Sequence, residues 1–371
     1  MEEDRDLKFM SKAISLAKKA EGKTNPNPIV GAVLVSKSGK TISSGYHRKA
    51  GTKHAEIVAI ERAAGRAKGA TLYVSLEPCS SYGKTPPCVD RIIESGIERV
   101  VIATLDPNPK NHNKGIKILK KSGIEVRSGV LKEEADYLNR VFFKHIKERV
   151  PYVSLKAALS LDGRIADSKG KSKWISSPDA RDFIHREIRS KVGAIMVGID
   201  TLLKDDSSLT VRDSKGGLIK DQPLRVVLDS NLRIPLESNI LKPKSGATLI
   251  VTSIKTENRK KRAELIKRGA HVIDIAYFSA RGLDLKRVLK ALYKEGVCHL
   301  LVEGGSSLLS SFLEKGLADY GYFFISNMIL GGDYLMYNGR EFKLDKCPKM
   351  IRRDCRCFNN SIMVSGDIVN V

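Results

Sequence analysis

The sequence predicts an α/β protein of two layered domains, and three observations point to it. The chain has 371 residues, which exceeds the length of one typical domain. In both halves, short apolar runs typical of strands alternate with stretches of helical spacing, a pattern of layered α/β sheets. The alternation pauses near Arg149 to Pro151, where a helical stretch stops and YVSLKAALSLDG begins as a strand. We therefore expect one domain over residues 1–149 and another over residues 150–371.

The elements of the first half follow from apolar spacing and from Gly and Pro. Apolar residues at helical spacing predict a helix over 4–19, and an Ala-rich stretch predicts one over 54–68 that Gly69 ends. Pro87 in the first turn and Gly96 beyond the end bound a helix over 87–94. Two further helices are expected over 115–121 and 133–147, and strands over 29–35, 41–46, 71–76, 100–104 and 124–127.

The second half repeats the alternation without any internal sequence repeat. After the strand that begins at Tyr152, helical stretches separate several of the apolar runs. Strands are expected over 194–197, 224–228, 248–252, 271–275, 299–302 and 322–325. The last thirty or so residues match no clear pattern.

Composition favours a globular cytoplasmic protein. Hydrophobic residues make up 42% and charged residues 29% of the chain, and no run approaches the roughly 18 apolar residues of a membrane span. The N-terminus, MEEDRDLKFM, is acidic and amphipathic, unlike a secretory signal. Without such a signal, the six scattered Cys favour thiols or metal ligands over disulfides. Three of them, Cys347, Cys355 and Cys357, match no common zinc spacing, and we interpret them as structural or incidental.

The net charge of +23 is the one unusual bulk property. A basic protein can attract nucleic acid or phosphorylated metabolites. Here Lys and Arg are mixed with Glu in helical segments such as ENRKKRAELIKRG, and no basic stripe with interleaved aromatic residues is present. This distribution favours a solvated surface.

The stretch from His54 to Cys88 carries the clearest chemistry. It reads HAEIVAIERAAGRAKGATLYVSLEPCSSYGKTPPC, with Glu56 two residues after the His and a Pro before both Cys79 and Cys88. One His and two Cys supply three zinc ligands and leave a fourth position for water, as in catalytic zinc sites. A carboxylate beside that water can move its proton, as in zinc deaminases of nucleobases. The alternative is a buried Cys pair with a surface His.

Several segments together resemble one bifunctional family. They are NPNPIVGAVLV, HAE, EPCSSYGKTPPC with eight residues between its Cys, and DPNP at 106–109. This set is similar to the riboflavin-biosynthesis deaminase/reductase family, and the likeness extends from about residue 7 to residue 332. The resemblance implies a cytidine-deaminase-like three-layer domain followed by a dihydrofolate-reductase-like α/β domain.

The resemblance also implies the first activity and its residues. Family members use zinc to deaminate 2,5-diamino-6-ribosylamino-4(3H)-pyrimidinone 5′-phosphate. Carried over by motif, one Zn²⁺ per chain is bound by His54, Cys79 and Cys88, and Glu56 is the catalytic proton carrier. The positions that bind the deaminase substrate are Asn27, His47 and Lys84. An amide and an imidazole can read ring edges, and a Lys can pair with phosphate.

The second half lacks the G-x-G-x-x-G dinucleotide fingerprint. Instead LKAALSLDGRIA, SKWISS, VGIDTLLKDDSSLTVR, RVVLDSNLRIP and VEGGSS follow in order, and as a set they resemble the family's reductase domain. That resemblance implies NADPH-dependent reduction of the ribosyl group to ribityl by hydride delivery to the sugar C1′. The positions implied for the cofactor are Ala158, Trp174, Thr201, Asp205, Ser230, Gly305 and Ser306. Those implied for the reductase substrate are Lys156, Ser172, Arg189, Leu209, Arg212 and Glu303.

Four places depart from the family pattern and leave other functions open. Ser81 stands where the family usually has His, Asn113 where it has Gly, and Ser207 where it has Pro. The segment SNMILGG, which ends at Gly332, stands where the family has a segment that contains Ala-Pro. Because the likeness fades after Gly332, one alternative is an active deaminase with a degenerate reductase domain. A nucleic-acid deaminase or binding protein is a remote one. As partners we expect a small phosphorylated pyrimidine and a second copy of the chain (dimer or tetramer), with no nucleic acid and no membrane.

Overall fold

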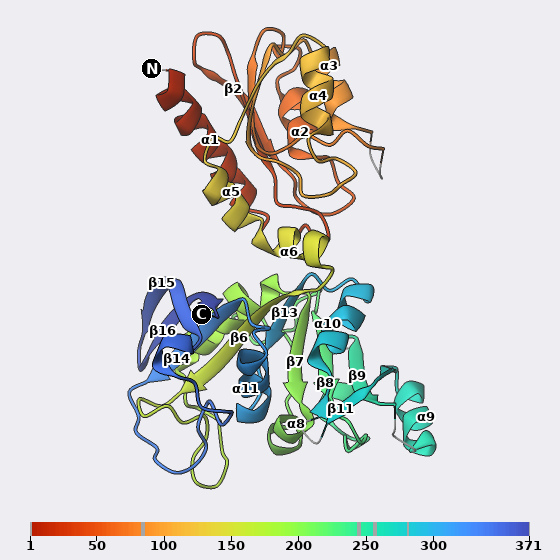
Figure 1. The fold of residues 1–371 in the computed structure, drawn as a ribbon, viewed down its shortest axis with the longest axis vertical. Coiled ribbons are helices and arrows are strands. Elements are labelled where there is room, and N and C mark those ends of the chain that lie inside the picture. Colours follow the sequence, from red (N-terminus) through yellow and green to blue (C-terminus); the bar gives the residue numbers. More distant parts are fainter. Residues whose placement is uncertain (1, 83–85, 243–245, 255–257, 280–281, 371) are drawn as a thin grey trace. The chain divides into compact units, whose positions relative to one another are not determined.

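A computed structural model describes residues 2–82, 86–242, 246–254, 258–279 and 282–370 (Figure 1). The chain divides into two compact units, Met1–Arg149 and Val150–Val371. Each unit contains one main sheet with helices on both faces, so the α/β architecture expected from the sequence is confirmed. Among the described residues, no helix is long and apolar enough to cross a membrane.

A five-stranded sheet forms the centre of the first unit. Its strands lie in the order β2 (Thr41–Tyr46), β1 (Gly31–Val35), β3 (Thr71–Leu76), β4 (Arg99–Thr104) and β5 (Glu125–Ser128). β1 is antiparallel to β2 and β3, whereas β3, β4 and β5 are parallel to one another. Because successive side chains of a strand point to opposite faces, Leu34 and Val35 enter the cores on the two sides of the sheet.

Helices cover both faces of this sheet. On one face lie α1 (Glu2–Lys18) and α5 (Lys132–Leu138). On the other lie α2 (Ala55–Arg62), α3 (Cys88–Glu94) and α4 (Lys114–Lys121). The approach of α1 to the sheet requires a glycine, because a Cβ on Gly31 would lie 2.1 Å from the carbonyl oxygen of Ala13.

Two helices of the first unit differ from the expectation. α2 ends at Arg62 instead of residue 68, because Ala64 and Gly65 adopt left-handed φ angles of 49° and 83°. The closing helix expected over 133–147 is two helices, α5 and α6 (Arg140–Glu148). The Asn139 side chain between them accepts a hydrogen bond from the N–H of Ile29 at 2.8 Å and donates one to its carbonyl at 3.0 Å.

A nine-stranded sheet forms the centre of the second unit. Its order is β10 (Ala270–Ile275), β9 (Thr248–Ser253), β8 (Leu224–Leu228), β7 (Ala194–Gly198), β13 (His299–Val302), β6 (Tyr152–Leu159), β14 (Tyr320–Ser326), β16 (Ser361–Val369) and β15 (Lys349–Phe358). The neighbouring strands from β10 to β14 in this order are parallel. At the end of the sheet, β16 pairs antiparallel with β14, and β15 pairs antiparallel with β16. A separate small hairpin pairs β11 (Tyr277–Ser279) with β12 (Gly282–Leu283).

Two helical layers cover this larger sheet. The apolar faces of α10 (Leu285–Lys294) and α11 (Ser306–Glu314) pack on one side. On the other side lie α7 (Pro178–Phe183), which continues into a π-helical turn (Ile184–Ile188), α8 (Ile199–Asp205) and α9 (Arg259–Lys267). Because β6, β7 and β13 are parallel neighbours, their carboxyl ends lie at the same edge of the sheet. Parallel α/β sheets bind ligands at this edge.

The sequence pattern did not reveal the C-terminal hairpin. β16 pairs with β14 from Tyr320↔Asp367 to Ser326↔Ser361 and so belongs to the main sheet. β15 is exposed along most of its length, so it lacks the apolar alternation of a half-buried strand. Cys355 and Cys357 lie exposed on β15, and all six Cys are free thiols.

Candidate functional site

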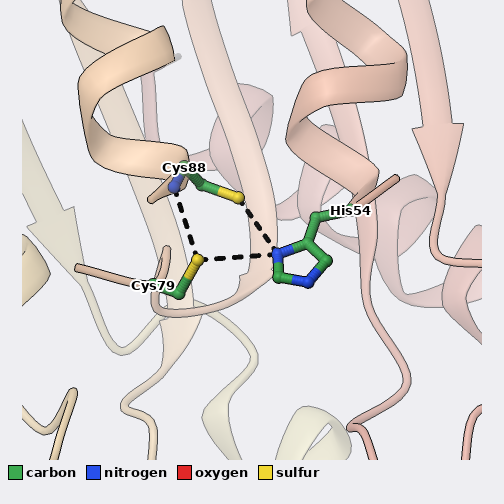
Figure 2. Close-up of side chains that lie close together, drawn as sticks. All are labelled: His54, Cys79 and Cys88. Carbon is green, nitrogen blue, oxygen red and sulfur yellow. Dashed lines mark hydrogen bonds between the residues drawn. The ribbon is translucent and has the colours of Figure 1, made fainter. Parts of the chain in front are cut away.

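The three predicted zinc ligands meet in the first unit. His54 is the N-cap of α2, Cys88 is the first residue of α3, and Cys79 lies in the loop after β3. His54 Nδ1 lies 3.2 Å from Cys88 Sγ and 3.5 Å from Cys79 Sγ. Figure 2 shows the three side chains pointing toward one another. Tetrahedral zinc would separate a nitrogen ligand from a sulfur ligand by about 3.6 Å, so the donor set fits this metal.

The local electrostatics favour the thiolate that a metal requires. A hydrogen bond from the Cys88 thiol, helped by the His54 ring, lowers the pKa of Cys79 to about 4 despite burial. The same interaction with Cys79 raises the pKa of Cys88. The backbone N–H of Cys88 also donates to Cys79 Sγ at 3.3 Å. Cys79 is thus a thiolate at neutral pH. Its sulfur lies at the N-terminus of α3, where the helix dipole stabilises negative charge.

Glu56 lies beside these ligands in the first turn of α2. Its side chain is only 3% exposed, and burial raises the pKa of the carboxyl. It lines a cavity of about 430 Å³ together with His54 and Cys79. A carboxyl with a raised pKa can accept a proton and return it near neutral pH, which is the requirement for general acid–base catalysis.

Asn27 and His47 line the same cavity and are joined by a hydrogen bond. His47 Nδ1 lies 3.1 Å from the carbonyl of Lys53, so Nδ1 carries the proton and Nε2 accepts from Asn27 Nδ2 at 3.1 Å. Burial lowers the pKa of His47 and keeps the ring neutral. The side-chain oxygen of Asn27 is therefore left for a ligand. The predicted Lys84 lies outside the described residues.

The cavity has two walls that sequence reasoning did not assign. One comes from the loop after β4 and includes Asp106, Asn108 and Asn111. The other comes from α6, at the far end of the unit, and includes Phe142 and His145. The DPNP turn motif was a signal for the first wall, whereas no pattern in α6 distinguishes it from an ordinary amphipathic helix.

An ion-pair cluster, whose side chains are only 8% to 16% exposed, marks the second unit. Arg189 makes two hydrogen bonds to the Glu303 carboxylate, at 2.6 and 2.8 Å, and Lys156 Nζ lies 3.8 Å from Glu303 Oε2. Burial alone would raise the pKa of Glu303, but Arg189 and Lys156 outweigh it and hold that pKa at about 2. Burial lowers the pKa of Lys156. These side chains come from β6, the segment after the π-helical turn and the end of β13.

This cluster lies in a cavity of about 700 Å³. Ten of the thirteen residues expected in the reductase site line it: Lys156, Ala158, Ser172, Arg189, Thr201, Asp205, Leu209, Glu303, Gly305 and Ser306. The Ser172 hydroxyl donates to Asp205 at 3.2 Å, and Thr201 Oγ1 accepts from the N–H of Gly305 at 3.1 Å. Residues far apart in sequence are thus joined around one cavity.

Three expected residues do not line that cavity. Trp174 is 70% exposed, and the Arg181 guanidinium lies 4.3 Å from its ring centroid. Arg212 is exposed, and Ser230 follows β8 at the same edge of the sheet.

The segment after Gly332 also contributes to the second cavity, and the expectation that the family likeness fades there is wrong, because the reductase family model extends to residue 363. Tyr334 and Asn338 line the cavity, and the Lys204 ammonium lies 4.7 Å from the Tyr334 ring centroid. Asp162 anchors the start of this segment by accepting the N–H groups of Leu330 and Gly331 at 3.1 and 2.8 Å. Sequence reasoning missed these residues because they follow no regular element.

Comparisons with known proteins match both halves of the chain. Residues 3–104 match the family model of the cytidine and deoxycytidylate deaminase zinc-binding region, and residues 151–363 match the RibD C-terminal domain. The chain is 46% identical to riboflavin biosynthesis protein RibD of Aquifex aeolicus over 327 residues, covering 88% of each chain. It is 37% identical to RibD of Escherichia coli over 334 residues, covering 89% of each.

Solved structures give the same result for the whole fold. A RibD structure from Acinetobacter baumannii matches with a TM-score of 0.86 and 36% identity over 99% of both chains. A diaminohydroxyphosphoribosylaminopyrimidine deaminase/5-amino-6-(5-phosphoribosylamino)uracil reductase from Thermotoga maritima matches with a TM-score of 0.84 and 35% identity over the full length of both. The expected order, a cytidine-deaminase-like domain followed by a reductase domain, is confirmed.

Proposed function

The chain belongs to the RibD family of riboflavin biosynthesis proteins, and from this membership we propose how its residues carry out two successive reactions. It is a bifunctional enzyme of the riboflavin pathway, a deaminase and a reductase that uses Zn²⁺ and NADPH. The substrate we propose is 2,5-diamino-6-ribosylamino-4(3H)-pyrimidinone 5′-phosphate, in accord with the name of the Thermotoga maritima relative.

In the first reaction, the ring amino group is exchanged for oxygen and leaves as ammonia. His54, Cys79 and Cys88 would hold the zinc, which when bound would make a water molecule acidic enough to supply hydroxide near neutral pH. Glu56 would accept the proton that the attacking water loses and return it to the amino group that leaves, a role favoured by the raised pKa of its carboxyl. Asn27 and His47 hold the pyrimidine edge, with the Asn27 side-chain oxygen facing the ring donors.

In the second reaction, the ribosyl group is reduced to a ribityl chain. NADPH, when bound, would supply the hydride that reduces C1′ of the sugar. Lys156 belongs to the ion-pair cluster and is the proton donor that we propose for this reduction. Glu303, which also pairs with Arg189, holds the Lys156 ammonium in place. Thr201, Asp205, Gly305 and Ser306 form the cofactor side of the cavity. Arg212 reaches the substrate phosphate, whose oxygens fit the guanidinium fork.

One observation carries this proposal: each unit contains its own cavity, lined by most of the residues expected to act in its reaction. The second cavity also argues against a degenerate reductase domain, because its ion-pair cluster is complete. We further propose a homo-oligomeric, cytoplasmic enzyme without affinity for nucleic acid, which sedimentation, cell fractionation and gel-shift assays at physiological salt test.

A coupled assay with the diaminopyrimidine phosphate tests the two reactions separately. Without NADPH, the zinc-loaded enzyme should release ammonia and give a product one mass unit heavier, because NH₂ is replaced by OH. With NADPH, a further gain of two mass units should accompany NADPH oxidation. Deamination without any NADPH oxidation would support the degenerate reductase instead.

A further inference from the structure

One wall of the deaminase cavity is formed by the loop of residues 106–115, and a single amide side chain organises this wall. Asn111 is 9% exposed and lines the cavity together with Ser81 and Asp106. No step of the deamination described above uses it. Its contacts nevertheless decide which hydrogen-bonding groups the wall presents to a ligand.

The orientation of the Asn111 amide follows from its partners. The backbone N–H of Ser80 points at Asn111 Oδ1 at 3.4 Å, and the Ser81 hydroxyl donates to the same oxygen at 2.9 Å. On the other side, Asn111 Nδ2 donates to Asp106 Oδ2 at 2.9 Å. Because a backbone N–H can only donate and an ionised carboxylate can only accept, the amide cannot be reversed without losing these bonds.

This orientation removes hydrogen-bond donors from the wall. The Ser81 proton is committed to Asn111, so the hydroxyl offers only lone pairs to the cavity. Asp106 accepts from Asn111 and, through Oδ1, from the N–H of Asn108 at 2.8 Å. At Ser81 and Asp106 the wall therefore presents acceptors.

The loop is held in place independently of Asn111. Glu77 is 3% exposed, and its carboxylate accepts the N–H groups of Asp106, Asn113 and Gly115 at 3.2, 3.0 and 3.1 Å. The loop also packs tightly on the segment before Cys79, because a Cβ on Gly115 would lie 2.3 Å from the carbonyl oxygen of Pro78. A change at Asn111 should thus alter the wall and leave the loop in position.

We propose that Asn111 is a specificity-determining residue of the deaminase, which orients Ser81 and Asp106 as acceptors for hydrogen-bond donors next to the reacting carbon of the substrate. The inference rests on the proposed function. The proposed substrate offers two kinds of donor, the ring N3–H beside the reacting C2 and the hydroxyls of the ribosyl group. A molecule with an acceptor at this place is rejected, because two facing acceptors are both left unpaired.

The test compares Asn111→Leu, which has a similar size but no polar atoms, with the wild-type chain. We expect KM for deamination to rise roughly tenfold with a smaller change in kcat, since about 1.4 kcal/mol of binding corresponds to a factor of ten. Asn111→Asp keeps the oxygen that faces Ser81 but sets a carboxylate against Asp106, so its KM should rise at least as much. Lys110→Leu is the matched control, an exposed side chain on the same loop that does not line the cavity.

Two readouts of the same preparation separate this role from a structural one. Zinc content should stay at one ion per chain, and NADPH oxidation with deaminated substrate should be unchanged. Substrates methylated at ring N3, or with a 2′-deoxyribosyl group, then identify the donor. The variant should lose its disadvantage with the analogue that lacks the contacted group.

Wild-type KM and kcat in Asn111→Leu would overturn the inference, as would an equal loss with the full substrate and both analogues. A wild-type enzyme that fails to deaminate the diaminopyrimidine phosphate would instead overturn the proposed function itself.

Discussion

The deaminase cavity and the reductase cavity are both lined by chemically specific residues, but these residues are distributed differently along the sequence. In the first unit, His54, Glu56, Cys79 and Cys88 come from one short stretch, and the starts of two helices bring them together. In the second, Lys156, Arg189 and Glu303 come from three distant segments that meet at one edge of the parallel sheet. A metal site needs only a few ligands of definite residue types, so a short sequence motif predicts it. A cavity for a large cofactor needs many strand ends, and only the ordered set of segments reveals it.

The largest expected effect separates the two cavities outright. Glu56→Gln removes the proton carrier but leaves the zinc ligands, so deamination should fall about 100- to 10,000-fold. Ammonia release measures this, with zinc content as the control. NADPH oxidation with deaminated substrate should be unchanged, and a parallel loss of both activities would contradict the separation of the sites.

A second prediction concerns the ion-pair cluster. Glu303→Gln leaves the largely inaccessible Arg189 and Lys156 without their carboxylate, so the second unit should lose about 1.5–3 kcal/mol of unfolding free energy. Denaturant unfolding measures the loss, and NADPH oxidation should disappear while ammonia release continues. Glu237→Gln is the matched control, because Glu237 is 84% exposed in its pair with Arg268 and such a pair contributes at most about 1 kcal/mol. Equal stability of the two variants would show that the cluster is not structurally important.

A third prediction concerns the pH dependence of the stability of the first unit. It depends on Asp6, a buried carboxylate that does not line the cavity. Asp6 is fully buried and accepts hydrogen bonds from Arg99, Arg127 and Tyr73, each at 2.9 Å. Burial alone would raise the pKa of Asp6, but these partners lower it below its ordinary value of 3.8. The stabilisation is therefore complete above the unfolded pKa and is lost as pH falls through the folded pKa.

Asp6→Asn should lower the melting temperature of the first unit near neutral pH and flatten its decline between about pH 5 and pH 3. Thermal unfolding followed across this range measures both effects. An acid decline equally steep in the variant would show that other carboxylates control acid unfolding.

The smallest expected effect is at Trp174, the only Trp of the chain. Because it is 70% exposed beside Arg181, bound NADPH should change its fluorescence. Trp174→Leu should raise KM for NADPH several-fold, corresponding to about 1 kcal/mol, and Trp174→Phe less, since it retains a ring. Fluorescence unaffected by saturating NADPH would place the cofactor away from this side chain.

The sequence anticipated the layered fold and the zinc site because both depend on local signals. Strand periodicity, the H-x-E pair and the Pro-Cys pairs are all contained within a few tens of residues. It did not anticipate the break at Asn139, because the partner of that side chain is Ile29 at the other end of the unit. It missed Asn111 and Tyr334 for a similar reason: their importance depends on loops that only the tertiary fold brings to a cavity. Exposed β15 gave no apolar pattern to recognise.

The break at Asn139 has a consequence for the growing chain on the ribosome. It directs α6 so that Phe142 and His145 line the deaminase cavity, whereas all three zinc ligands precede residue 89. A nascent chain thus acquires its metal ligands well before it can close the cavity around a substrate. The ability to bind zinc and the ability to enclose a pyrimidine therefore arise at different moments of synthesis, and only the complete first unit has both.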